Sequence, residues 1–184
     1  MFLVQLFCFL KLDLMKNKLV KWKNISDLIS DLNLRKSDIV FTNGCFDIIH
    51  PGHIHILEKA KSYGDVLIVG LNSNRSVKKL KGESRPINSE SDRIKILCSI
   101  KHVDHVIVFD EDSPIELIKL IKPNFLVKGG DYNKSEIVGA DLVEKNEGSV
   151  IIIDLLGGYS TLSIIDTATL IGFFGTSLLI PVGK

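Results

Sequence analysis

The feature that most constrains this chain is the stretch FTNGCFDIIHPGH, which runs from Phe41 to His53. An apolar run typical of a strand, 38–41, precedes the loop, and a helix-like run, 54–62, follows it. Pro51 suits the first turn of that helix, because its missing N–H removes no hydrogen bond there. The stretch therefore predicts a strand, a tight loop and the N-terminus of a helix.

The start of this helix carries groups that suit a phosphate. Gly52 is expected to leave backbone N–H groups open to a ligand at the positive end of the helix dipole. His50 and His53 are three residues apart, so both imidazoles should fall on one side of the first turn. Taken alone, such a pair can also be a metal pair, a surface accident or two hydrogen-bonded structural histidines. No Cys or carboxylate cluster completes a zinc site, and the sequence contains neither a dinucleotide fingerprint nor a P-loop, so no metal ligands are predicted.

Strand-like and helix-like segments alternate along the rest of the chain. Strands are expected at 38–42, 65–71, 103–109, 125–127 and 150–154, and helices at 25–34, 54–62, 75–80, 89–100, 115–121 and 137–146, with a last helix after the loop 157–161. This alternation predicts an α/β fold, a single Rossmann-like domain with a five-stranded parallel sheet and helices on both faces.

Three polar segments follow strands of this predicted sheet. TNGCFDIIHPGH follows the first strand, KGGD at 128–131 follows the fourth, and GYST at 158–161 follows the fifth. Ligands of open α/β sheets bind at the carboxyl ends of the strands, so the three segments predict one site. The polar loop 72–88, which contains the basic residues of KKLKGESR, is interpreted as a functional loop beside it.

Composition narrows the function classes. The formal net charge of the 184 residues is +1, which gives no basic field for nucleic acid. Three cysteines without repeated spacing favour a reducing compartment, and a cytoplasmic location is predicted. The apolar run 1–10 lacks a basic leader and is too short to span a bilayer. We interpret 1–23 as an N-terminal extension that packs weakly, 24–169 as the domain and 170–184 as an apolar tail.

Four segments of the chain resemble the cytidylyltransferase-like nucleotidyltransferases with an HxGH signature. They are FTNGCFDIIHPGH, the basic loop LNSNRSVKKLKGESRPIN, LVKGGDY and GGYST. The resemblance runs in order from about residue 39 to 165, and within the family it is to the heptose 1-phosphate adenylyltransferases. It implies ATP as co-substrate with Mg²⁺, and transfer of AMP to D-glycero-D-manno-heptose 1-phosphate. The products would be ADP-heptose, used for lipopolysaccharide core, and pyrophosphate. A homodimer and a separate sugar kinase are also implied.

The resemblance also implies site residues. The catalytic groups would be His50, His53 and Lys81. The nucleotide and its phosphates would be bound by Phe41, Thr42, Asn43, Gly44, Gly52, Lys78, Arg85, Lys128, Gly130, Asp131, Ser160 and Thr161. From the residues alone, Ser160 and Thr161 would equally suit a helix cap, and the lysine run a solvated face.

The sequence departs from the family pattern at two places, and two other functions are considered. The sequence has NSN at 72–74 where the family usually has NSD, and STLSIIDTAT follows GGY where the family tends to continue with a basic helix end. The nearest alternative enzyme is a cytidylyltransferase that acts on glycerol 3-phosphate or another phosphorylated alcohol. The alternative of another class is a non-catalytic nucleotide-binding protein, or one that uses its apolar ends at a membrane.

Overall fold

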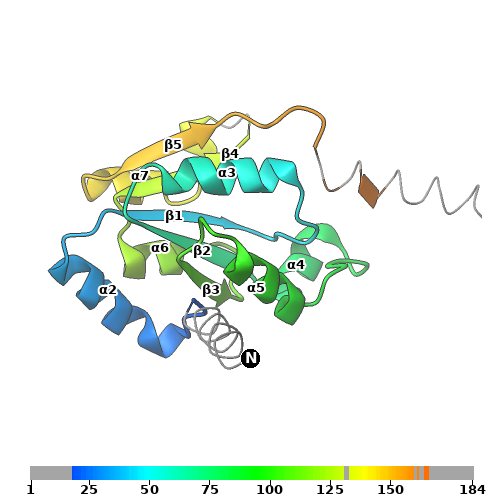
Figure 1. Ribbon diagram of the computed structural model, residues 1–184, viewed down its shortest axis with the longest axis horizontal. Helices are drawn as coiled ribbons and strands as arrows, with labels where there is room; N and C mark the ends of the chain where they lie inside the picture. Colours follow the sequence, from blue (N-terminus) through cyan, green and yellow to red (C-terminus); the bar gives the residue numbers. More distant parts are fainter. Residues whose placement is uncertain (1–17, 131–132, 160, 162–163, 166–184) are drawn as a thin grey trace, which may run out of the picture.

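The five expected strands form one parallel sheet. The computed structural model describes residues 18–130, 133–159, 161 and 164–165. The strand order is β3-β2-β1-β4-β5, and Figure 1 shows the strands from β5 at the top to β3 at the bottom. The bounds are β1 (Ile39–Gly44), β2 (Val66–Asn72), β3 (His105–Phe109), β4 (Phe125–Gly129) and β5 (Ser149–Ile153). The predicted fold class is confirmed.

Helices cover both faces of the sheet. One face packs against α2 (Ile25–Leu34), α6 (Ile115–Ile121) and α7 (Ala140–Lys145), and the other against α3 (Pro51–Lys61) and α5 (Glu90–Ser99). The short helix α4 (Asn74–Lys81) begins directly after β2, and two 3₁₀ turns, η1 (Trp22–Asn24) and η2 (Lys134–Glu136), complete the order.

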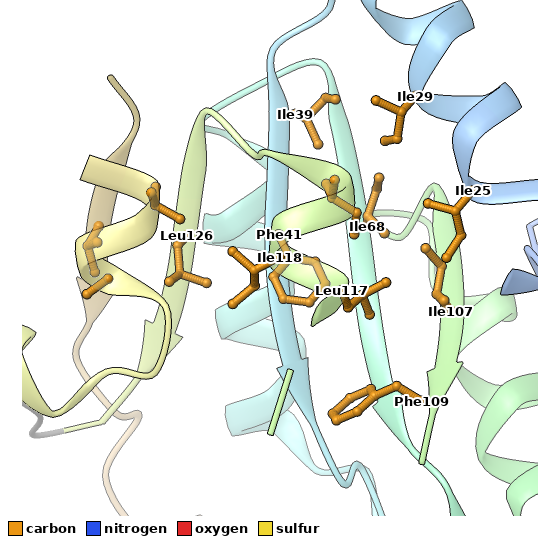
Figure 2. Packing of buried hydrophobic residues seen from close by; sticks show 14 of the residues in the cluster. Ile25, Ile29, Ile39, Phe41, Ile68, Ile107, Phe109, Leu117, Ile118 and Leu126 are labelled. Atoms are coloured by element: carbon orange, nitrogen blue, oxygen red, sulfur yellow. The ribbon is translucent and has the colours of Figure 1, made fainter. Parts of the chain in front are cut away.

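Alternation along the strands divides the core into two halves. In β1, Phe41 packs with α2 and α6, whereas the preceding Val40 packs on the side of α3. Figure 2 shows the first half, a cluster to which α2 contributes Ile25, α6 contributes Leu117 and β2 contributes Ile68. Each fully buried side chain of this kind stabilises the fold by about 1.5–3 kcal/mol. Burial on both faces explains why the strands read as continuous apolar runs.

Strands β1 and β4 pair over a much shorter length than their neighbours do. Their register has two pairs, Val40 with Phe125 and Phe41 with Leu126. By contrast, β1 and β2 share six pairs, and β4 and β5 share five. The β1–β4 junction is also where the strand order reverses, which is where ligands bind in open α/β sheets.

A segment before η1 lies along the edge strand β3. The Val106 N–H donates to the carbonyl of Lys18 at 2.8 Å, and the Val20 N–H donates to the carbonyl of Val106 at 2.9 Å. The Trp22 indole N–H extends this contact by donating to the carbonyl of Val108 at 2.7 Å. Residues 18–22 therefore cover the free edge of β3.

Several expected boundaries differ from the observed ones. The helix expected at 137–146 begins only at Ala140, because Gly139 has a left-handed φ of 87° and the preceding residues form η2. The strand expected at 103–109 begins at His105. The last expected helix and the apolar ends lie largely outside the described residues. Among the described helices, none has both the length and the apolar character that a membrane crossing requires.

Candidate functional site

A cavity of about 470 Å³ lies at the carboxyl ends of β1 and β4, against the start of α3. Its lining comes from the loop after β1, the first turns of α3, the end of α4, the end of β4 and the segment after β5. These residues are Thr42, Asn43, Gly44, Cys45, Phe46, Asp47, His50, Gly52, His53, Ile56, Lys81, Lys128, Gly129, Leu155, Leu156, Tyr159 and Thr161. The three polar segments that the sequence placed at one site do converge.

The two histidines of HPGH stack on each other at the N-terminus of α3. The ring centroids of His50 and His53 are 3.9 Å apart, and the ring of Phe46 lies 5.3 Å from that of His53. The Nδ1 atom of each imidazole is buried without a hydrogen-bond partner among the described residues. A side chain at Gly52 would meet the His50 ring at 3.1 Å, so the glycine makes room for that imidazole.

Both imidazoles are held neutral. Burial, followed by the neighbouring His50 and Lys81, lowers the pKa of His53 to about 4. Burial also lowers the pKa of His50. A bound phosphate would oppose this effect, because a nearby negative charge favours the imidazolium. A bound phosphate would therefore raise the pKa of both imidazoles.

The lysines of α4 divide between the cavity and the protein surface. Lys81, at the end of the helix, lines the cavity. Lys78 lies 3.5 Å from Glu83, and Lys79 lies 2.6 Å from Asp112, both as exposed pairs. The lysine run therefore contributes one residue, Lys81, to the cavity, and the other two pair with surface carboxylates.

Lys128 supplies a second ammonium group at the end of β4. Its Nζ donates to the side-chain oxygen of Asn43 and lies 3.4 Å from the Asn43 carbonyl. Burial lowers the pKa of Lys128 to about 8. With this pKa, Lys128 remains largely charged near pH 7. Its contact with Asn43 bridges β1 and β4 beyond their last paired residues, where the strand order reverses.

Arg85 holds a loop and does not line the cavity. Its Nε donates to the buried carboxylate of Asp47 at 2.7 Å, and the N–H groups of Ile87 and Asn88 donate to the same carboxylate at 2.8 and 2.9 Å. Burial acts to raise the pKa of Asp47, but the two backbone donors and Arg85 outweigh it and lower that pKa. Asp47 thus orders the loop after β1.

Arg93 of α5 is also part of the framework. Its guanidinium is 0% exposed and donates to the carbonyls of Cys45 at 2.8 Å and Asn72 at 2.7 Å, and to the side chain of Asn74 at 2.9 Å. It therefore joins the loop after β1 to the end of β2 and the start of α4, which carries Lys81.

Most of the sequence-predicted site residues meet in the cavity. These are Thr42, Asn43, Gly44, His50, Gly52, His53, Lys81, Lys128 and Thr161. Four others do not line it: the Phe41 side chain is in the core, Lys78 and Arg85 have protein partners, and Gly130 donates its N–H to the carbonyl of Ile153. Asp131 and Ser160 lie outside the described residues.

Sequence reasoning missed the apolar wall of the cavity. Leu155, Leu156 and Tyr159 follow β5 and line the site although they are among the more exposed apolar side chains. Tyr159 belongs to the GYST segment, which the sequence had placed at the site. Leu155 and Leu156 lie between the strand end and that segment, and this position was the available signal, because an exposed apolar run beside a polar loop marks a contact surface.

The described donors do not suit a protein-held Mg²⁺. Mg²⁺ takes oxygen ligands, and proteins bind it through one or two carboxylates together with substrate phosphates. Asp47 is the one carboxylate among the cavity residues above, and its oxygens already accept from Arg85, Ile87 and Asn88. No cluster of three metal-ligating side chains occurs among the described residues. Among the described residues, the site therefore offers no free carboxylate to a Mg²⁺ ion, and bound phosphates would supply oxygen ligands.

The sequence is similar to a known protein family and to curated proteins of other bacteria. The cytidylyltransferase-like family model matches residues 41–154. The chain is 56% identical over 146 residues to the bifunctional protein HldE of Campylobacter jejuni subsp. doylei, and 55% identical over 141 residues to that of Nitratiruptor sp.. These matches cover 79% and 76% of this chain but 31% and 30% of the relatives. The chain therefore spans about a third of the length of the curated relatives it matches.

Two solved structures share the fold. A lipopolysaccharide core biosynthesis protein from Thermoplasma volcanium matches with a TM-score of 0.53 and 29% identity, over 65% of this chain and 97% of that one. A pantoate-beta-alanine ligase from Francisella tularensis, complexed with an ATP analogue and beta-alanine, matches with a TM-score of 0.53 over 83% of this chain and 77% of that one. At 18% identity, the second likeness concerns the fold alone.

Proposed function

Because the chain belongs to the cytidylyltransferase-like family, we propose that it is a nucleotidyltransferase acting on a sugar phosphate. The reaction is transfer of AMP from ATP to D-glycero-D-manno-heptose 1-phosphate, giving ADP-heptose and pyrophosphate. The observation that carries the proposal is the convergence of His50, His53, Lys81 and Lys128 on one cavity. Imidazole and ammonium donors around one space suit a chain of phosphates.

The chemistry follows from these groups. An oxygen of the acceptor phosphate attacks the α-phosphorus of ATP, a new P–O bond forms, and the bond to the β-phosphate oxygen breaks. Such transfer needs positioning and charge stabilisation more than covalent help from the protein. His50 and His53 would contact the phosphates whose charge grows as pyrophosphate leaves, and Lys81 would neutralise it from α4. Mg²⁺, when bound, would supply further charge neutralisation on the phosphates.

The nature of the acceptor rests on the relatives. The curated relatives at 50–57% identity are bifunctional HldE proteins, and one solved relative is named for lipopolysaccharide core biosynthesis. Together with the motif resemblance, these names favour heptose 1-phosphate over another phosphorylated alcohol. We propose that a separate sugar kinase supplies this acceptor, that the protein acts in the cytoplasm, and that it forms a homodimer, which light scattering would test.

The experiment that tests the function measures pyrophosphate release. The purified chain is incubated with heptose 1-phosphate and each of ATP, CTP, GTP and UTP in the presence of Mg²⁺. We expect release with ATP and formation of ADP-heptose. A preference for CTP with glycerol 3-phosphate would replace this proposal with the cytidylyltransferase alternative. Nucleotide binding without turnover of any acceptor would favour a non-catalytic protein.

A further inference from the structure

A second, smaller cavity lies next to the first. It has a volume of about 210 Å³ and is lined by Asn43, Pro114, Lys128, Glu136, Ile137 and Val138. Its walls come from the ends of β1 and β4, the start of α6 and the region of η2. Pro114 and Ile137 adjoin helices that pack with the first half of the core, so this cavity opens on the face of the sheet opposite α3.

The two cavities meet at one contact. Asn43 and Lys128 line both, and Lys128 donates to the Asn43 side chain. This contact spans β1 and β4 beyond their last paired residues, Phe41 and Leu126. The two cavities therefore adjoin at the strand-order reversal, with the ammonium group of Lys128 between them.

Size shows what the smaller cavity can hold. Sites for complete small-molecule ligands span roughly 300–1,000 Å³. At about 210 Å³ the smaller cavity falls below this range, whereas the larger one lies within it. It therefore suits one ring of a ligand whose remainder lies in the larger cavity.

The linings of the two cavities differ in chemistry. The larger cavity has an apolar and aromatic wall of Leu155, Leu156 and Tyr159, which suits the flat face of a nucleobase. The smaller cavity carries the carboxylate of Glu136 and the amide of Asn43 beside apolar carbon surface. A carboxylate accepts strongly from hydroxyl groups and repels phosphates. The smaller cavity thus matches a ring with many hydroxyl groups.

We propose that this smaller cavity binds the polyhydroxylated ring of the acceptor sugar phosphate, with Glu136 as the residue that accepts from its hydroxyl groups. The proposal rests on the proposed function. The acceptor phosphate would lie at the junction beside Lys128, one bond from the ring and next to the nucleotide in the larger cavity. Attack on the α-phosphate would then proceed from the junction.

Glu136 is held in place without using both of its oxygens. One oxygen accepts from the Asn133 N–H at 3.0 Å, as part of the capping box that begins η2. The other accepts from no group in the part of the chain that the structure describes, and it can meet a ligand hydroxyl. Glutamine at this position can keep the capping contact through its carbonyl oxygen, so Glu136→Gln separates ligand contact from folding.

The first test measures steady-state kinetics of Glu136→Gln with heptose 1-phosphate and ATP. We expect KM for heptose 1-phosphate to rise about tenfold or more, in line with loss of one charge-assisted hydrogen bond, with KM for ATP unchanged. Glu116→Gln is the matched control, because Glu116 is an exposed carboxylate on α6 that pairs with Lys119. The control should resemble the wild type in both constants.

The second test fills the cavity. Val138 is 47% exposed, so Val138→Phe should be tolerated by the fold while its ring occupies the space for the sugar. We expect heptose 1-phosphate binding, measured by calorimetry, to fall at least tenfold while ATP binding is retained. If either variant weakens ATP instead, or if neither changes the sugar constants, the inference is wrong. Failure of the proposed function would appear differently, as absent pyrophosphate release in the wild type.

Discussion

Two sets of cations surround the carboxyl ends of the strands, and they serve different purposes. Arg85 and Arg93 are buried, and their guanidinium groups donate to protein oxygens on loops and strand ends. Lys81 and Lys128 line the cavity with single ammonium groups. A guanidinium has five donors in a fixed plane and can join several segments, whereas an ammonium is a compact charge on a flexible stem.

The difference shows that a basic residue near a phosphate motif is not by itself a phosphate contact. Arg85 lies four residues after Lys81, yet it faces Asp47. The framework arginines set the positions of the loop after β1 and of α4, and the lysines carry the charge that a substrate would meet. Substitutions should therefore separate loss of stability from loss of activity.

Removal of Arg93 should have the largest effect, because it acts on both properties. In Arg93→Met the carbonyls of Cys45 and Asn72 lose their buried donor. Each unsatisfied buried group costs about 1–3 kcal/mol, so we expect the two to lower the free energy of unfolding by about 2–6 kcal/mol, together with loss of most of the activity. Urea denaturation measures the first, and pyrophosphate release the second. If Arg93→Met were as stable as the wild type, the buried arginines could not be distinguished from the cavity lysines by a role in stability.

Removal of an imidazole should affect activity alone. His53→Ala takes away a donor from the cavity, and loss of one preorganised donor typically lowers kcat about 10²–10³-fold. Its buried Nδ1 has no protein partner in the described part of the chain, so the melting temperature should be little changed. Near-normal turnover in this variant would count against the proposed site.

Removal of the ammonium group of Lys81 should have a smaller effect on activity than removal of an imidazole. Lys81→Met should lower kcat/KM about 10–100-fold, the equivalent of one hydrogen bond to a charged group, without loss of stability. Lys79→Met is the matched control, since Lys79 is on the same helix and pairs with Asp112 at the surface. Equal loss in both variants would mean that the general charge of α4 matters and the position of Lys81 does not.

A further effect should appear in the pH dependence of stability. The pKa of His53 is about 4 in the folded protein, against about 6.5 for an exposed histidine. Between these values the unfolded chain binds the proton and the folded chain does not, so the fold loses stability as pH falls from about 6.5 to about 4. We expect the melting temperature to fall across this window, and to fall less in His53→Phe. An unchanged slope in the variant would contradict the neutral state assigned to His53.

Local pattern was sufficient to predict much of this molecule. Apolar runs bounded by polar loops located the five strands, and Pro51 marked the start of α3, because both depend on neighbouring residues. The roles of Arg85 and Arg93 depend on partners 38 and 48 residues away, which periodicity does not reveal. The convergence of three loops was predicted because the carboxyl ends of parallel strands share one edge. Leu155 and Leu156 after β5 belong to no motif, and their place in the cavity wall was missed.

The pairing of residues 18–20 with β3 bears on how two copies of this chain can associate. Val106 uses its N–H and its carbonyl in this pairing, and the carbonyl of Val108 accepts from the Trp22 indole. These are backbone groups that an incoming strand from another molecule would need. Continuation of the sheet across a twofold axis at β3 would therefore begin with displacement of the chain's own segment. A dimer formed through helical surfaces would leave that segment undisturbed.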